Sequence, residues 1–280
     1  MTGCSTTSTD ADQPAPSSTP WPAVAEELPV TGPPRLPYVD RHALVFPGGR
    51  TLAVDLPLRG RWGISSITRD GGDYLVTDDR YFEGSVGMYR LDRRGRVLDA
   101  WTSTGPALPG PDETAAWVSL VPPESGESGP ALILAGPRTQ EVTDQFFPHI
   151  TSFDGQTVAY SARVPERGRR VVTRTFVTDL VHAPREVPKP PDRVVSPGGR
   201  HWFRFRRDEL VIGSGAGQVA VPSSNLIETS ARAAWEDDKH LLATWTQGKR
   251  QAIVRIDLDG SVARASEWMR PWLAGFAFLD

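Results

Sequence analysis

The sequence predicts an all-β fold, and more specifically a β-propeller, from three observations. One hairpin phrase recurs along the chain, a second phrase recurs at a spacing typical of blade repeats, and the composition suits many short strands and turns. The 280 residues are 39% hydrophobic and 23% charged, and they include 26 Gly and 26 Pro. A single all-β domain of about 250 residues is common, so this length does not require two domains.

The clearest copy of the hairpin phrase lies at residues 149–160. Apolar residues alternate up to a turn at Asp154-Gly155, and they alternate again from residue 157 to residue 162. Two alternating runs joined by such a turn indicate a β-hairpin, because Gly readily adopts the positive φ that the turn needs. Related copies begin at Pro47, Asp70, Pro197 and Asp237.

The second phrase sets the length of the repeat. Residues 90–97 parallel residues 255–262, and the two copies begin 165 residues apart. Four units of about 41 residues give that offset, which lies within the range of propeller repeats. Each unit therefore predicts two hairpins, which form the four strands of one blade.

The predicted ring has six blades, with seven as the alternative. Complete blades are expected at residues 63–102, 114–143, 149–188, 193–222 and 231–268. The second of these is the weakest, with clear strands only at 115–121 and 130–135. The sixth blade is split between the two ends of the chain, so the C-terminal strand at 273–279 should pair with the N-terminal hairpin at 42–56 and leave no open sheet edge.

The two phrases resemble a known family. The opening hairpin around Phe153-Asp154-Gly155-Gln156 and the closing phrase at residues 255–262 are similar to the TolB-like, WD40-like β-propellers of bacteria. The run Trp235-Glu236-Asp237-Asp238 before an apolar strand is similar to repeats in actinobacterial propeller lipoproteins. The likeness covers residues 37–280, but the Gly-His and Trp-Asp signatures of true WD40 repeats are missing. The resemblance implies a fold and leaves the activity open.

Residues 1–36 are expected to be a separate, disordered tether, because they are rich in Ser, Thr, Pro, Ala and Asp and have no sustained apolar period. Cys4 is the only cysteine, so no intrachain disulfide is possible. Met1-Thr2-Gly3-Cys4 resembles the end of a bacterial lipoprotein signal, which implies lipidation at Cys4 and an extracytoplasmic protein anchored to the cell membrane. The alternative is an incidental exposed thiol. Residues 37–280 would then form the propeller domain.

Partners and cofactors are only weakly constrained. The net charge of −3 does not favour nucleic-acid binding, so no nucleic-acid partner is expected. Membrane contact is expected only through the lipid anchor. The glycine-rich run at 213–217 precedes a strand rather than a helix, so we interpret it as a hairpin turn and not as a phosphate-binding loop. We likewise interpret Asp257-x-Asp259-Gly260 as a turn and not as a calcium loop, because the other ligands of such a loop are lacking.

No catalytic residue, metal or cofactor is predicted. A Gly-x-Ser-x-Gly elbow is absent from the sequence. The histidines are expected to have structural roles on separate blades; they are His42, His149, His182, His201 and His240. The strands nearest the ring axis are expected to carry mainly apolar residues, which weighs against a catalytic site there.

The candidate partner-binding residues lie in the turns between the second and third strands of the blades. In a propeller these turns share one face with the links between blades. Ordinary solvent-exposed turns would also be charged, but three neighbouring turns here are basic and one carries aromatic residues. The predicted site consists of Arg167, Arg169, Arg170, Arg207, Lys249, Arg250, Tyr81 and Phe82.

Two classes of function remain open from the sequence. The first is a non-catalytic, monomeric propeller at the cell surface that presents these turns to a protein or an anionic partner. The second is a propeller-fold hydrolase or lyase with a site in the central channel. We favour the binding module.

Overall fold

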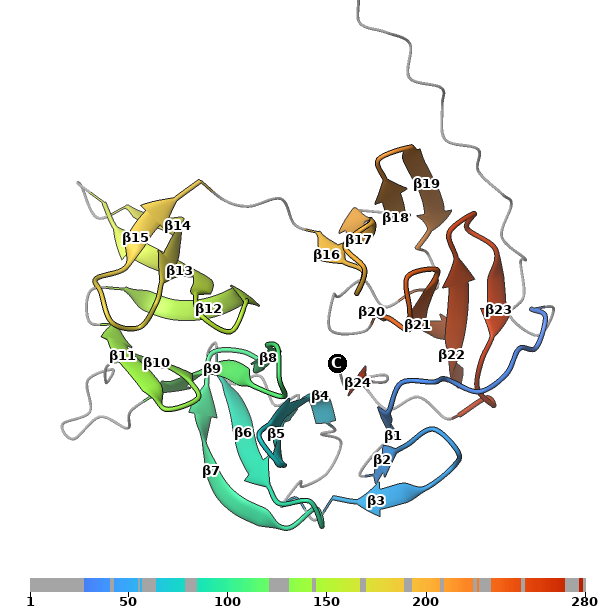
Figure 1. Ribbon diagram of the computed structural model, residues 1–280, viewed down its shortest axis with the longest axis horizontal. Coiled ribbons are helices and arrows are strands. Elements are labelled where there is room, and N and C mark those ends of the chain that lie inside the picture. The colour runs from blue at the N-terminus through green and yellow to red at the C-terminus, as the bar shows by residue number, and fades with distance from the viewer. Residues whose placement is uncertain are drawn as a thin grey trace, which may run out of the picture.

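The computed structural model describes residues 28–40, 43–54, 56, 64–78, 85–120, 131–142, 145–166, 170–188, 193–206, 209–223, 226, 233–247, 250–269 and 277–278. The regular secondary structure of these residues is entirely β-strand, in five hydrogen-bonded sheets arranged around a common axis (Figure 1). This arrangement confirms the predicted all-β, propeller-like fold. Within the described residues no helix is long and apolar enough to cross a membrane.

Four of the five sheets have four strands each, as propeller blades do. The first, in hydrogen-bonded order, contains β24 (Ala277–Phe278), β1 (Tyr38–Asp40), β2 (Ala43–Val45) and β3 (Thr51–Ala53). Another contains β12 (Phe146–Phe153), β13 (Val158–Pro165), β14 (Val171–Thr178) and β15 (Arg185–Val187). The next contains β16 (Val194–Val195), β17 (His201–Arg206), β18 (Glu209–Ser214) and β19 (Gly217–Pro222). The last contains β20 (Ala233–Trp235), β21 (His240–Gln247), β22 (Arg250–Asp257) and β23 (Val262–Arg264).

The fifth sheet has eight strands. Its first half contains β4 (Ile64–Asp70), β5 (Asp73–Asp78), β6 (Val86–Leu91) and β7 (Val97–Ser103). Its second half contains β8 (Leu108–Pro109), β9 (Ala115–Leu120), β10 (Ala131–Ala135) and β11 (Arg138–Val142). The halves are joined where Thr102 of β7 pairs with Leu120 of β9. The predicted count of six blades depends on how this sheet is divided.

The hairpin phrase folds as its turn chemistry predicts. Asp154 and Gly155 lie between β12 and β13, and Gly155 has a φ of 90°. The Asp154 carboxylate accepts the backbone N–H groups of Gln156 at 2.9 Å and Thr157 at 2.6 Å. These bonds satisfy turn amides that no strand partner reaches, which is why Asp before Gly favours this turn. The runs at 213–217 and 257–260 are also turns, between β18 and β19 and between β22 and β23.

The two ends of the chain meet in one sheet. β24 pairs antiparallel with β1, through Tyr38 opposite Phe278 and Val39 opposite Ala277, and β1 pairs in turn with β2. The predicted pairing of the C-terminal strand with the sheet of the N-terminal hairpin is therefore present. Figure 1 shows β24 on the inside of the ring, beside the axis.

Residues 28–36, which the sequence places in the tether, lie against the last sheet. Leu28 is buried in an apolar cluster with residues of β17, β18, β21 and β22. Val30 forms a parallel bridge with Arg264 of β23, and the backbone N–H of Thr31 donates to the carbonyl of Arg264 at 2.8 Å. This segment adds backbone pairing to the exposed edge of β23, where unpaired N–H and C=O groups would otherwise face water.

Candidate functional site

The predicted partner-binding residues lie mostly outside the described residues. Tyr81, Phe82, Arg167, Arg169, Arg207 and Lys249 are among those not described, and so is Cys4. Arg170 and Arg250 are described, and both are exposed. They lie at corresponding turns of two different sheets, the β13–β14 turn and the β21–β22 turn. We call the face that carries the turns between second and third strands the loop face.

Some of the positive charge on the loop face is paired. Arg206 lies 3.1 Å from Glu209 across the β17–β18 turn. Arg174 of β14 lies 2.8 Å from Glu186 and 3.3 Å from Glu166. Exposed ion pairs of this kind contribute about 0–1 kcal/mol to stability, but they reduce the net charge that a partner would meet.

Asp78, at the end of β5, has a structural role. Its side chain is buried, and its carboxylate accepts the backbone N–H of Gly87 at 2.9 Å and the hydroxyl of Tyr89 at 3.2 Å. A buried carboxylate that receives such bonds fixes the start of β6 against the end of β5. Asp78 is therefore not available to a partner on this face.

An exposed aromatic pair lies at the loop-face end of β12, where Phe146 pairs with Arg163 of β13. Phe146 and Phe147 are 48% and 46% exposed, although they begin the innermost strand of their sheet. Phe147 has a φ of 51°, a region that costs a non-glycine residue about 1–3 kcal/mol, and the strand register is irregular between Phe146 and His149. The guanidinium of Arg163 lies 5.6 Å from the Phe147 ring centroid.

Phe146 and Phe147 were not among the predicted site residues, although the sequence itself indicates that they are exposed. Two adjacent aromatic residues before Pro148 break the alternation of β12, so both cannot point into the core. Backbone strain that persists at an exposed aromatic residue is typical of binding positions. Phe146, Phe147, Arg163 and Arg170 therefore form the described part of the candidate site.

His149 on β12 has an unusual environment for an inner-strand residue. Its side chain is exposed to solvent, yet surrounding protein atoms desolvate the imidazole and lower its pKa from the usual 6.5. The protein atoms around the imidazole include the backbone of Gly105, in the link between β7 and β8. A Cβ on Gly105 would overlap the His149 ring, so only Gly leaves room for it there. The imidazole is therefore held neutral near pH 7.

The inner strands are also less apolar than the sequence analysis expected. Besides His149, β4 carries Ser65, Ser66 and Thr68. The Ser65 hydroxyl donates to the carbonyls of Thr77 and Asp78, and the Thr68 hydroxyl donates to the carbonyl of Ala107 at 3.1 Å. The hydroxyls of Ser65 and Thr68 are thus satisfied by backbone partners, which indicates structural roles, whereas the buried hydroxyl of Ser66 has no hydrogen-bond partner among the described residues.

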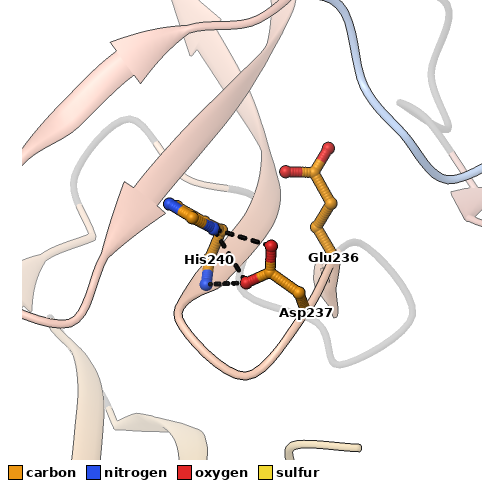
Figure 2. Close-up of side chains that lie close together, drawn as sticks. All are labelled: Glu236, Asp237 and His240. Carbon is orange, nitrogen blue, oxygen red and sulfur yellow. Dashed lines mark hydrogen bonds and ion pairs between the residues drawn. The ribbon is translucent and has the colours of Figure 1, made fainter.

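A second cluster of titratable groups lies at the β20–β21 hairpin. Glu236, Asp237 and His240 each offer a ligand atom, and these atoms lie within 4.8 Å of one another (Figure 2). Nδ1 of His240 lies 2.7 Å from Oδ1 and 2.8 Å from Oδ2 of Asp237. Such a spacing could in principle hold a cation, so the partners of each carboxylate decide the matter.

Two arginines occupy the carboxylates of this cluster. Arg255 donates Nε to Oε2 of Glu236 at 2.6 Å and Nη2 to Oε1 at 2.8 Å, a bidentate pair. Arg35 donates its backbone N–H to Oε1 of Glu236 and its guanidinium to Oδ2 of Asp237, both at 2.6 Å. A divalent cation would have to displace both guanidinium groups, so the geometry fits an ion-pair network and not a metal centre.

The pKa of the carboxyl groups agrees with this interpretation. Burial tends to raise the pKa of Glu236, but hydrogen bonds from Arg255 and from the Arg35 backbone outweigh it, and the net pKa is lowered. Burial also opposes ionisation of Asp237, and bonds from His240 and Lys239 again lower its pKa overall. Both groups are therefore ionised at neutral pH and complement the arginines.

The same network ties the N-terminal segment to the last sheet. Nη1 of Arg255 donates to the Thr31 hydroxyl at 2.8 Å and to the Gly32 carbonyl at 3.1 Å, and Nη2 donates to the Pro33 carbonyl at 3.2 Å. Arg35 adds its contacts from the same segment. The cluster thus fastens residues 31–35 to β20–β22. No sequence pattern predicts it, because Arg35 is more than 200 residues away from Glu236 and Asp237 in the chain.

Comparison with known proteins bears on the fold. The crystal structure of TolB from Acinetobacter baumannii matches with a TM-score of 0.53 and 13% sequence identity, over 88% of this chain and 67% of that chain. The chain therefore has a TolB-like β-propeller fold, as its repeat phrases predicted. At this identity the likeness does not extend to function.

Two further solved structures match more weakly. A chimera of ACO and RPE65 matches with a TM-score of 0.37 and 13% identity, over 85% of this chain and 70% of that one. A post-proline cleaving enzyme from Rickettsia typhi matches with a TM-score of 0.36 and 8% identity, over 85% of this chain and 45% of that one. No protein-family model and no curated protein matches the sequence.

Proposed function

We propose that this TolB-like β-propeller is a non-catalytic binding module that presents its loop face to a protein or an anionic partner. The observation that carries the proposal is the exposed pair Phe146 and Phe147 beside Arg163, at the end of the β12–β15 sheet that also carries the exposed Arg170. Aromatic residues and Arg are enriched where proteins bind partners, and an exposed aromatic pair has no benefit for stability alone.

The sequence extends this site along the loop face. Arg167 and Arg169 belong to the same β13–β14 turn as Arg170, and Arg207, Lys249 and Arg250 belong to the equivalent turns of the next two sheets. Arg recognises carboxylate and phosphate through its planar fork of donors. Tyr81 and Phe82, from the β5–β6 turn, supply aromatic groups at another position around the ring.

Charge reversal tests this assignment. Arg169→Glu with Arg170→Glu should reduce partner capture and should change the free energy of unfolding by about 0.5 kcal/mol or less, as for other surface changes. Capture by the unaltered protein should also weaken steeply with salt, because exposed charges are screened over about 8 Å at physiological ionic strength. The matched control is Arg94→Glu with Lys239→Glu, two exposed cations in turns on the opposite face. Equal capture by the reversed protein and the control would contradict the proposal.

We further propose that the propeller is a lipoprotein, anchored through Cys4 outside the bacterial cytoplasmic membrane. The support is the Met1-Thr2-Gly3-Cys4 run followed by a polar segment. When the protein is produced with a lipoprotein signal, it should partition with membranes, and Cys4→Ser should release it without altering its thermal transition. A Cys4→Ser protein that stays with the membrane fraction would contradict lipidation.

We infer that the eight-stranded sheet is two blades joined along one edge, which makes six blades in all. The support is that β4–β7 matches a predicted repeat of four strands, and that only the pair Thr102 and Leu120 joins β7 to β9.

One observation favours a second candidate function, a hydrolase or lyase with its site in the central channel. His149 is exposed on β12, the inner strand of its sheet, and its pKa is lowered, so a neutral imidazole is available as a general base at pH 7. Activity on chromogenic esters that disappears in His149→Gln, with an unchanged thermal transition, would support this function over the binding module.

A further inference from the structure

In most blades of this protein the fourth strand pairs with the whole of the third strand. All residues of β6, β10 and β18 have partners on their outer neighbours β7, β11 and β19. In the β12–β15 sheet the fourth strand is much shorter than the third. The three residues of β15 pair only with residues 175–177 of the eight-residue strand β14. Residues 171–174 of β14 therefore have no partner strand on their outer side among the described residues.

The last sheet has the same mismatch in strand length, but there the chain itself fills the gap. Strand β23 pairs only with residues 254–256 of β22. Residues 265–269 then continue along the same edge, where Gln251 and Met269 form an antiparallel bridge with backbone N···O distances of 2.8 and 2.9 Å. A third strand of this fold can therefore accept an extended segment beyond its fourth strand. The sequence after β15 is Pro188-Lys189-Pro190-Pro191, which is poorly suited to do the same because proline has no N–H.

The unpaired part of β14 directs backbone groups outward. Glu166 donates its N–H to the carbonyl of Arg170 at 2.7 Å across the β13–β14 turn, so that carbonyl points toward β13. Backbone groups alternate between the two edges of a strand, so those of Val171 and Thr173 point away from β13. The register agrees, because Val171 lies opposite Pro165, which has no N–H to donate. Val171 is 54% exposed and Thr173 is also exposed, and within the part of the chain that the structure describes their outward N–H and C=O groups have no partner.

The side chains along this edge match a strand of alternating apolar and acidic residues. Val171 and Thr173 lie on one side of the sheet, and their neighbours Arg170 and Arg174 alternate onto the other side. Arg174 is already paired with two carboxylates, whereas Arg170 has no ion pair among the described residues. Residues 166–174 contain four Arg and one Glu, so this hairpin is positively charged. A carboxylate on an added strand would form a cross-strand ion pair with Arg170, and an apolar side chain would cover Val171.

We propose that the outer edge of β14 at residues 171–173, which we call the open β14 edge, binds an extended acidic segment of a partner protein as an added antiparallel strand. The proposal rests on the binding function proposed above and specifies how the partner is held at the loop face. An unpaired strand edge is a template for such pairing, which derives affinity from main-chain hydrogen bonds and specificity from alternate side chains. A second copy of this chain is a poorer occupant, because two such edges would bring like charges together.

The first test uses the full chain and a fluorescein-labelled peptide of about eight residues that alternates Val and Glu, with binding followed by anisotropy. In the proposed pairing the Val residues lie opposite Val171 and Thr173, so their N–H groups point toward β14 and those of the Glu residues point to solvent. N-methylation of the Val residues should weaken binding about tenfold, because it removes the donors to two carbonyls of β14. N-methylation of the Glu residues is the matched control and should leave the affinity within about twofold.

The second test changes the protein. Thr173→Pro removes the outward N–H of Thr173 and should weaken peptide binding about tenfold, because the proline ring also occupies the space of the added strand. That N–H does not pair with β13, and proline is tolerated at sheet edges, so the thermal transition should change little. The matched control is Thr173→Val, which keeps the N–H and should bind the peptide within about twofold of the unaltered protein.

Several results would overturn the added strand. Equal affinity of the two methylated peptides would do so, and so would no binding of the unmethylated peptide at about 1 mM. A dimer of the unliganded chain that Thr173→Pro dissociates would make a second copy the occupant instead. Failure of the proposed function is distinguishable, because Arg169→Glu with Arg170→Glu would then capture as much partner as its control. Reduced capture by that variant, together with equal binding of the methylated peptides, would keep the loop-face module and remove the added strand.

Discussion

At the scale of single residues, Glu236 is an ionised carboxylate in surroundings that are unfavourable for a charge. Its side chain has no solvent exposure, and that of Arg255 is 11% exposed. Ionising a carboxylate away from water is unfavourable unless partners replace its hydration, and here two guanidinium groups and one backbone N–H do so. Because the network also holds residues 31–35, its loss should release the N-terminal segment from the last sheet.

Replacing Glu236 should therefore destabilise the protein strongly. Glu236→Gln leaves Arg255 without its bidentate partner, and we expect a loss of about 3–5 kcal/mol in the free energy of unfolding, measured by urea denaturation. The control is Arg96→Gln, which removes an exposed pair with Asp92 and should cost about 0–1 kcal/mol. Since the pKa of Glu236 is lowered in the folded protein, its contribution is present above pH 4.5 and is lost as the pH falls below that value. A loss of 1 kcal/mol or less in Glu236→Gln would show that the network is not a stabilising latch.

His149 should give stability a pH dependence in a different range. Its pKa is lowered in the folded protein, so the unfolded chain binds a proton first as the pH falls through 6.5. Stability contributed by neutral His149 is thus present above pH 6.5 and is lost as the pH falls through its folded pKa. Comparison of denaturation curves from pH 8 to pH 5 for the natural protein and His149→Gln isolates this group from the other histidines. Parallel pH profiles for the two proteins would contradict a lowered pKa.

At the scale of elements, local signals in the sequence were sufficient for the hairpins. Asp154-Gly155 correctly marked the β12–β13 turn, and the predicted blade at 193–222 corresponds to β16–β19, residues 194–222. The signals are strong because period-two alternation and turn chemistry are both local properties of a few residues. The strand β1 was missed because Tyr38–Asp40 is only three residues long. The packing of residues 28–36 was missed because it depends on partners far away in the sequence.

Local signals in the sequence also predicted only part of the candidate site. The basic turns were visible as composition, but the exposure of Phe146 and Phe147 required the bulged start of β12. Trp202 and Arg204 likewise look like ordinary strand residues until their register shows which side of the sheet they face. Side-chain direction depends on register, and register depends on the whole sheet.

The element whose removal should matter most is β24. Deletion of residues 273–279 removes its pairing with Tyr38 and Val39 and exposes a sheet edge on the inside of the ring. We expect a lower and broader thermal transition, since the ends of the chain would no longer be joined in one sheet. Deletion of Asp280 alone is the control and should leave the transition unchanged. A truncated protein that melts as sharply as the full chain would rule out closure through β24.

At the scale of the whole molecule, the order of the apolar clusters matters more than their number. They connect the sheets in a row that begins at β16–β19, passes through the joined ends of the chain and finishes at β12–β15. Among the described residues, no such cluster joins β12–β15 to β16–β19. Energetically the molecule resembles a stack of repeats whose two end units, β12–β15 and β16–β19, each have one packed neighbour instead of two.

This arrangement predicts an uneven pattern of amide hydrogen exchange. Units at the ends of a stack open more readily than units with two packed neighbours, because less apolar surface is exposed when they unfold. Amides of β13 and β17 should therefore exchange faster than those of β5 and β22, which belong to sheets that are packed on both sides. Uniform exchange across the four strands would show that the sheets open as one unit, and the boundary between β12–β15 and β16–β19 would then be no weaker than the other boundaries between sheets.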